Sequence, residues 1–102
     1  MIQKDLAGTY EDPAYSKAVS IKTNGMPEEM QLFAIELAKE ALEKCANYEE
    51  MAKKMKLEFD KRYGATWHCI VGTQFGSYLN HEANRNTFFF IGREGFLLWK
   101  TV

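Results

Sequence analysis

The hydrophobic period of this sequence changes at Gly64, and no other feature restricts the fold as strongly. Upstream, apolar residues recur three and four positions apart, which is the spacing of an amphipathic helix. Downstream, aromatic and β-branched residues form short runs separated by glycine-containing turns, which is typical of strands. Because helices precede most of the strands instead of alternating with them, the sequence predicts an α+β fold with an antiparallel sheet.

The first predicted helix begins near residue 27. Asn24-Gly25 offers a cap, and Pro27 suits the first turn, where its missing N–H is harmless. Glu28-Glu29 complements the positive end of the helix dipole. An apolar stripe then recurs at helical spacing and predicts one buried face, at positions 30, 33, 34, 37, 38, 41, 42 and 45.

The second predicted helix has a signal at each end. Asn47 and Glu50 have the spacing of a capping box, and Lys61-Arg62 suits the last turn. Gly64 is typical of a left-handed C-cap. The core-facing stripe of this helix is predicted to comprise Tyr48, Met51, Ala52, Met55 and Phe59.

Strands are predicted on both sides of the helices. One short strand covers residues 18–22, and the turn at 92–95 makes a hairpin of the last two strands. The predicted order is β-α-α-β-β-β-β, with two helices packed on the antiparallel sheet. The four later strands are predicted at residues 66–71, 75–80, 87–91 and 96–100.

The chain length supports one domain, at residues 17–102. Residues 1–16 mix glycine, proline and charge without a sustained period, so we expect a flexible N-terminal extension.

Both faces of the predicted sheet are apolar, since successive residues of TFFFI and FLLW point to opposite sides. Two helices can cover only one face. An exposed apolar face of this kind marks an association surface, so we infer a second chain against it.

Charge and composition exclude several classes of partner. The formal net charge of −1 gives no general attraction to nucleic acid or anionic lipid. The longest apolar runs have four residues, whereas a membrane-spanning helix needs about 20. Cys45 and Cys69 lie too far apart for a Cys-x-x-Cys site. The N-terminal residues lack the apolar stretch of a signal peptide, so we do not expect secretion. We expect a cytoplasmic protein that contacts neither nucleic acid nor membrane.

Catalytic and metal-binding motifs are not found in the sequence. His68 and Cys69 are adjacent on a predicted strand, so they face opposite sides and cannot form a dyad. His81-Glu82 lacks the second histidine of a zincin helix, and Ser77 lacks the glycines of a nucleophile elbow. We therefore expect no enzyme activity, no metal and no cofactor.

The remaining feature is the segment from residue 68 to residue 82. Gly72 and Gly76 bracket a predicted strand in which Gly76 permits close approach of another backbone. Such an edge strand can accept a peptide by β-strand addition. The alternative, that Gly76 marks only a bulge, is equally compatible with the spacing.

The sequence resembles the cytoplasmic dynein light chain family, of the small hub type, from about Lys17 to Lys100. The shared motifs stand in family order without a gap. They are MPEEMQ (MSEEMQ in the family), ALEK, EFDK, TWHCIVG, FGSY, HE and LLWK (LLFK in the family).

The resemblance implies a non-catalytic, strand-swapped homodimer that binds short linear motifs by strand addition and promotes dimerisation of their carriers. Phe88 and Phe90 would form the opposite wall of the groove, and Tyr48 and Glu49 would meet the glutamine of the motif. The groove strand would comprise Phe75, Gly76, Ser77, Tyr78, Leu79, Asn80 and His81.

The resemblance also implies a dimer interface. His68 would pair with its symmetry mate, and its desolvation would disfavour the charged imidazole, so we expect acid to weaken dimerisation. The interface would comprise His68, Thr73, Phe75, Ser77 and Tyr78.

The implied partners are a dynein intermediate chain and other proteins with disordered Thr-Gln-Thr-like motifs, on the microtubule cytoskeleton. Departures from the family pattern affect side-chain selectivity more than backbone pairing, and occur at Tyr48, Glu49, Thr73, Asn80, Asn86, Phe88 and Phe90. Three of them, Tyr48, Asn80 and Asn86, motivate an alternative. In it the chain is a dedicated subunit of an axonemal dynein, in a cilium or flagellum, with one fixed partner or as a heterodimer.

Overall fold

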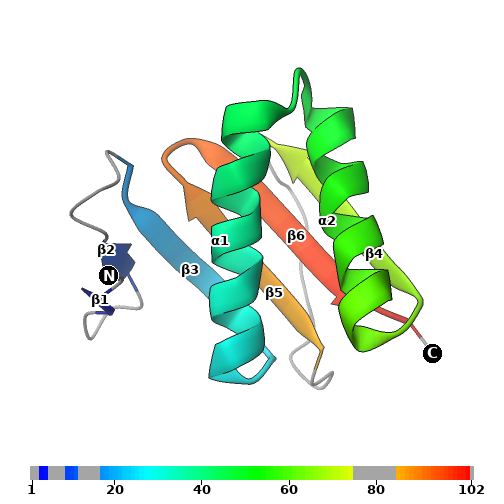
Figure 1. The fold of residues 1–102 in the computed structure, drawn as a ribbon. Helices are drawn as coiled ribbons and strands as arrows, with labels where there is room; N and C mark the ends of the chain where they lie inside the picture. The colour runs from blue at the N-terminus through cyan, green and yellow to red at the C-terminus, as the bar shows by residue number, and fades with distance from the viewer. Residues whose placement is uncertain (1–2, 5–8, 12–16, 75–84, 102) are drawn as a thin grey trace.

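A computed structural model of the chain describes residues 3–4, 9–11, 17–74 and 85–101. Both helices lie on the same face of one twisted sheet, with their axes side by side (Figure 1). In chain order the elements are β1 (Gln3–Lys4), β2 (Thr9–Glu11), β3 (Val19–Asn24), α1 (Glu28–Lys44), α2 (Tyr48–Tyr63), β4 (Trp67–Gly72), β5 (Asn86–Ile91) and β6 (Glu94–Lys100).

The sheet confirms the predicted fold class. Its strand order is β1-β2-β3-β5-β6-β4, and every pair is antiparallel. β5 and β6 form the predicted hairpin, in which Ile91 pairs with Glu94 across a two-residue loop. Gly92 begins that loop at φ +60°, which fits the type II′ turn that matches strand twist. The strand predicted at residues 75–80 lies outside the described residues.

The N-terminal stretch contributes two short strands to the sheet. β2 pairs with β3 through Tyr10 opposite Val19 and Thr9 opposite Ser20, and β1 pairs with β2. Other residues of 1–16 lie outside the described ones, so the flexibility of the extension stays a prediction.

Helix α1 begins as predicted but without the predicted cap. Pro27 is the N-cap residue and no side chain caps the helix. Asn24 Oδ1 instead accepts a hydrogen bond from the Met26 amide at 3.2 Å, so the cap predicted at Asn24-Gly25 is wrong. The buried face also includes Ile35 and Gln31, which the predicted stripe omitted; the Thr87 hydroxyl donates to Gln31 Oε1 at 2.7 Å.

Helix α2 begins and ends at the predicted residues, but Gly64, at φ +81° and ψ 150°, does not adopt the left-handed helical conformation predicted for its cap. Asn47 Oδ1 accepts from the Glu50 amide at 2.8 Å, and Glu50 Oε1 accepts from the Ala46 amide at 3.0 Å. Gly64 ends the helix at φ +81°, a conformation that side chains disfavour. Of the predicted core-facing stripe, Met51, Met55 and Phe59 are buried and Ala52 is half-buried. The core position predicted for Tyr48 is wrong: this residue starts the helix and is exposed, and its hydroxyl bonds to Glu94.

The end of α2 is fixed to the start of β4 by packing and by hydrogen bonding. The rings of Phe59 and Trp67 meet edge to face with centroids 4.8 Å apart, and both are fully buried. Asp60 Oδ1 accepts from the Trp67 amide at 2.7 Å while its other oxygen pairs with Lys56. These two bonds hold the pKa of Asp60 below its usual range.

Replacing Asn47, the N-cap residue of α2, tests the hydrogen bond that caps this helix. Asn47→Ala removes the acceptor for the Glu50 amide, so the free energy of unfolding in urea should fall by about 1 kcal/mol. Lys53→Ala, an exposed position within the same helix, is the matched control and should leave it unchanged within about 0.5 kcal/mol. Equal effects of the two substitutions would contradict the assigned cap.

Candidate functional site

Strand β4 ends the sheet, and its outer edge pairs with no strand among the described residues. Along an unpaired edge, N–H and C=O groups of alternate residues face outward and can pair with an added strand. The edge runs from Trp67 to Gly72 and lies beside α2 (Figure 1). This arrangement provides a template for one further strand.

The sheet face opposite the helices is predominantly apolar, as the alternation predicted. The ring of His68 stacks on that of Trp99 with centroids 5.4 Å apart. The ring centroids of Phe88 and Phe90 lie 5.3 Å apart. Ile70 is 48% exposed. The aromatic and aliphatic residues that share this face by strand alternation, with His68, are Ile70, Phe88, Phe90, Leu97 and Trp99, and the polar residues Ser20 and Asn86 lie on it as well.

A shallow cavity of about 400 Å³ lies between α2 and the edge of the sheet. The helix contributes the two cations Lys53 and Lys56, and the strands contribute His68 and Trp99. The described residues that line it are Ala52, Lys53, Lys56, His68, Cys69 and Trp99. Because Lys56 is already paired with Asp60, Lys53 is the charged group at this cavity without an ion pair among the described residues.

The start of α2 is connected to the β5–β6 hairpin through the carboxylate of Glu94. The Tyr48 hydroxyl donates to Glu94 Oε2 at 3.1 Å, Arg93 Nε donates to the same oxygen at 3.4 Å, and Lys17 Nζ lies 3.4 Å from Oε1. Burial alone would raise the pKa of Glu94, but these donors and charges together hold it below its usual range.

Glu94 is not among the residues that the sequence predicts for the site. One local signal was present, because a glutamate directly after a hairpin loop continues an otherwise apolar strand. Its partners could not be identified from the sequence, since Tyr48 lies 46 positions away and Lys17 lies 77 positions away.

The described residues include only part of the predicted site. Tyr48 and Glu49 are exposed at the start of α2, and Thr73 is exposed just after β4. Phe88 and Phe90 are half-buried neighbours on β5. The predicted groove strand lies outside the described residues, at Phe75, Gly76, Ser77, Tyr78, Leu79, Asn80 and His81.

The described residues offer little for catalysis. Burial raises the pKa of the Cys69 thiol to about 12, so this sulfur is protonated at neutral pH. The side chain packs against the core, whereas His68 stacks on Trp99 across the sheet. Within the described part of the chain, no three His, Cys, Asp or Glu side chains cluster as metal ligands would, and no helix is long and apolar enough to cross a membrane.

The bond between Tyr48 and Glu94 predicts a pH-dependent stability. Tyr48→Phe removes one donor to a carboxylate, so we expect a loss of about 1 kcal/mol in unfolding free energy at pH 7. A carboxyl with a lowered pKa stabilises the fold above its unfolded pKa and loses that contribution as the pH falls through the folded value. The difference between wild type and variant should therefore shrink in acid, as urea titrations at several pH values will measure.

Tyr63→Phe is the control for this experiment, because its hydroxyl makes no hydrogen bond within the described residues. A loss for Tyr48→Phe that stays constant from pH 7 into the acid range would contradict the assigned pairing with Glu94.

Comparison with known proteins identifies the family. The model of the family described as dynein light chain type 1 matches residues 18–101. A protein of Emericella nidulans described as cytoplasmic dynein light chain is 47% identical over 81 residues, which cover 79% of this chain and 86% of that protein.

Solved structures agree with this assignment. Two structures of the dynein light chain-like domain of the Fasciola hepatica calcium binding protein FhCaBP2, a mercury derivative and a native form, are each 25% identical to this chain. Their TM-scores are 0.73 and 0.71, covering 89% and 90% of this chain and 99% of each of those chains. With the family match spanning both helices and strands β3 to β6, this chain belongs to the dynein light chain family.

Proposed function

We propose that this light chain acts without catalysis, as a strand-swapped homodimer that binds two disordered partner segments. The observation that supports the proposal most directly is the outer edge of β4 beside α2, which pairs with no other strand that the structure describes. In the proposed dimer, residues 75–80 of each protomer pair with β4 of the other. The outer edge of this added strand then accepts a short linear motif as an antiparallel strand.

The apolar sheet face supports the presence of a second protomer. Ile70 is half exposed and Trp99 is partly exposed, on the side of the sheet away from the helices. Covering such groups gains about 25 cal/mol for each Å² of apolar surface removed from water. The interface in this proposal includes His68 and Thr73 of the described residues, together with Phe75, Ser77 and Tyr78.

The start of α2 would form one end of each groove. Glu49 is exposed there, and Tyr48 has its hydroxyl committed to Glu94, so its ring offers an apolar edge to an incoming side chain. Phe88 and Phe90 form an aromatic pair on the opposite wall. Backbone pairing does not depend on side chains, so we expect Thr-Gln-Thr-like motifs to bind, with selectivity set by these residues.

Two grooves in one dimer would hold two partner chains side by side. Ordering a disordered segment costs free energy, so each site alone is weak. Once one segment is bound, a linked second segment faces its groove at an effective concentration on the order of millimolar. The dimer therefore gains avidity for partners that are themselves dimeric. A cytoplasmic, microtubule-associated dynein intermediate chain is the partner we propose first.

Peptide titration tests the binding mode. A Thr-Gln-Thr peptide should bind by calorimetry with micromolar affinity and with two peptides per dimer. Ser77→Pro removes an N–H from the proposed groove strand and should weaken binding at least about tenfold. Ser77→Ala keeps the N–H and serves as the control.

Binding by Ser77→Pro at wild-type affinity would contradict strand addition. Binding of several unrelated Thr-Gln-Thr peptides would support a light chain that serves several different partners. Binding of none, with a stable dimer or heterodimer, would favour the dedicated axonemal subunit instead.

Acidification tests the proposed role of His68 in the dimer. Burial of the imidazole at the interface disfavours its charged form, and Lys53 and Lys56 of α2 line the same cavity and oppose that charge. Asp60 is the nearby acid and is paired with Lys56. Sedimentation should show a dimer at pH 7 and a larger monomer fraction at pH 5.

His68→Gln is the control, because glutamine does not titrate in this range. If it forms a dimer, its mass should be the same at both pH values. Since the chain has two histidines, His81→Gln tests the other one. A wild-type dimer of unchanged mass at pH 5 and micromolar concentration would contradict the proposal.

A further inference from the structure

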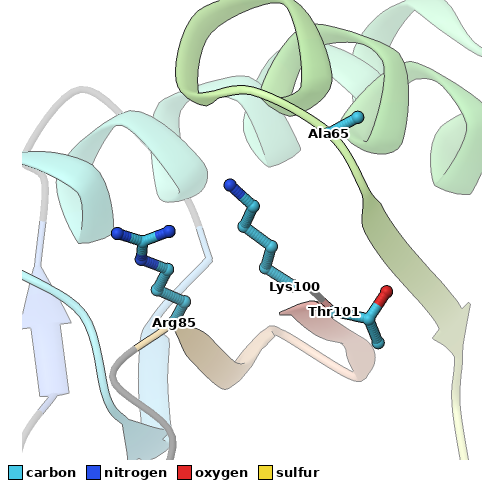
Figure 2. Close-up of a pocket in the computed structure, with 4 residues that line it drawn as sticks. All are labelled: Ala65, Arg85, Lys100 and Thr101. Carbon is cyan, nitrogen blue, oxygen red and sulfur yellow. The ribbon is translucent and has the colours of Figure 1, made fainter.

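A cavity of about 190 Å³ opens at the far end of β6, beside the last turn of α2. Three separate chain segments build it: the link after α2, the residue before β5 and the end of β6. The described residues that line it are Ala65, Arg85, Lys100 and Thr101 (Figure 2).

Backbone hydrogen bonds fix these segments relative to one another. The Lys100 amide donates to the Arg85 carbonyl at 3.0 Å, and the Thr101 amide donates to the Thr66 carbonyl at 2.9 Å. The lining residues therefore lie on the ordered margin of the sheet, and their spacing is set by the β4–β6 and β5–β6 pairing.

Two positively charged side chains, Arg85 and Lys100, line this cavity. Lys100 Nζ donates to the Tyr63 carbonyl at 3.3 Å and forms no ion pair, and the Arg85 guanidinium forms none, within the described part of the chain. Both side chains extend from the sheet in the same general direction (Figure 2). Asp60, an acid in the last turns of α2, is occupied by Lys56 and by the Trp67 amide.

Two positive charges that face one cavity repel each other, and this repulsion is an unfavourable electrostatic energy. An anion bound between them replaces it with attraction to both charges. We propose that this cavity binds a phosphate monoester dianion, presented on a phosphorylated side chain or as free phosphate. Its charge of about −2 at neutral pH matches the two cations, whereas a single carboxylate would neutralise only one.

The donors suit a tetrahedral oxyanion. The guanidinium of Arg85 offers a planar fork for two oxygens, and the ammonium of Lys100 retains donors beyond the one used by Tyr63. Thr101 also lines the cavity, but its hydroxyl lies 2.9 Å from His68 Nε2, so the two cations are the groups available to the anion. This inference goes beyond the proposed function and does not depend on it, since none of its lining residues belongs to the predicted groove.

Titration of the full-length protein with inorganic phosphate at pH 7.5 tests the site, with amide and Arg85 Nε–H shifts in the NMR spectrum as the readout. We expect saturable shifts at residues 85, 100 and 101. Arg85→Gln should weaken the affinity about tenfold, because it removes a charge-assisted pair. Arg85→Lys keeps the positive charge but lacks the planar guanidinium that can bind two oxygens. Its affinity for phosphate should lie between those of wild type and Arg85→Gln.

Lys22→Gln is the matched control: it removes one exposed positive charge on β3 and should leave the affinity unchanged. Arg85 is exposed, so its variants are expected to fold, and they decide the outcome even if Lys100→Gln destabilises the sheet. Non-saturating shifts, or equal affinity in wild type and Arg85→Gln, would overturn the proposal.

A second arm distinguishes the source of the phosphate. A phosphoserine peptide that binds more tightly than inorganic phosphate would support a phosphorylated protein partner, whereas equal affinities would support the free anion. The same peptide without its phosphate should not shift these residues. Binding of a Thr-Gln-Thr peptide, measured separately on Arg85→Gln, should match wild type, so failure here and failure of the proposed function give different results.

Discussion

The contact between Phe59 of α2 and Trp67 of β4 is the interaction on which the rest of the structure depends. It joins the helical half of the chain to the strand half at the point where the hydrophobic period changes. Asp60 adds a hydrogen bond to the Trp67 amide, so the helix and the strand keep a fixed relation. The outer edge of β4, the cavity beside α2 and the cationic cavity at the end of β6 all lie next to this junction.

Local chemistry explains which parts of the fold could be predicted from sequence. The capping box of Asn47 and Glu50 and the positive φ of Gly64 depend on residues close together in the sequence, so both ends of α2 could be predicted from the sequence. The cap of α1 could not be predicted in this way, because the Asn24 side chain accepts a hydrogen bond from the Met26 amide before the helix starts. Gln31 was also missed, since its burial depends on a hydroxyl partner 56 positions away.

The same distinction applies to the candidate site. Alternation along β5 and β6 predicted a second apolar face, and the rings of Phe88, Phe90 and Trp99 lie on it. Glu94 and the Arg85–Lys100 pair could not be found in this way, because the topology of the sheet brings distant residues together. The groove strand itself was assigned through resemblance to the family, since spacing alone left a bulge at Gly76 as an equal alternative.

The two short strands at the N-terminus have a consequence for assembly. Among the described residues they pair along the outer side of β3, so the strand at that margin of the sheet has two residues. The strand at the other margin, β4, has six. A sheet that is receptive at both margins can pass pairing from molecule to molecule and grow into a fibril. Because the other margin of the described sheet is this short, a strand added beside β4 would end the pairing there instead of passing it on to a further molecule.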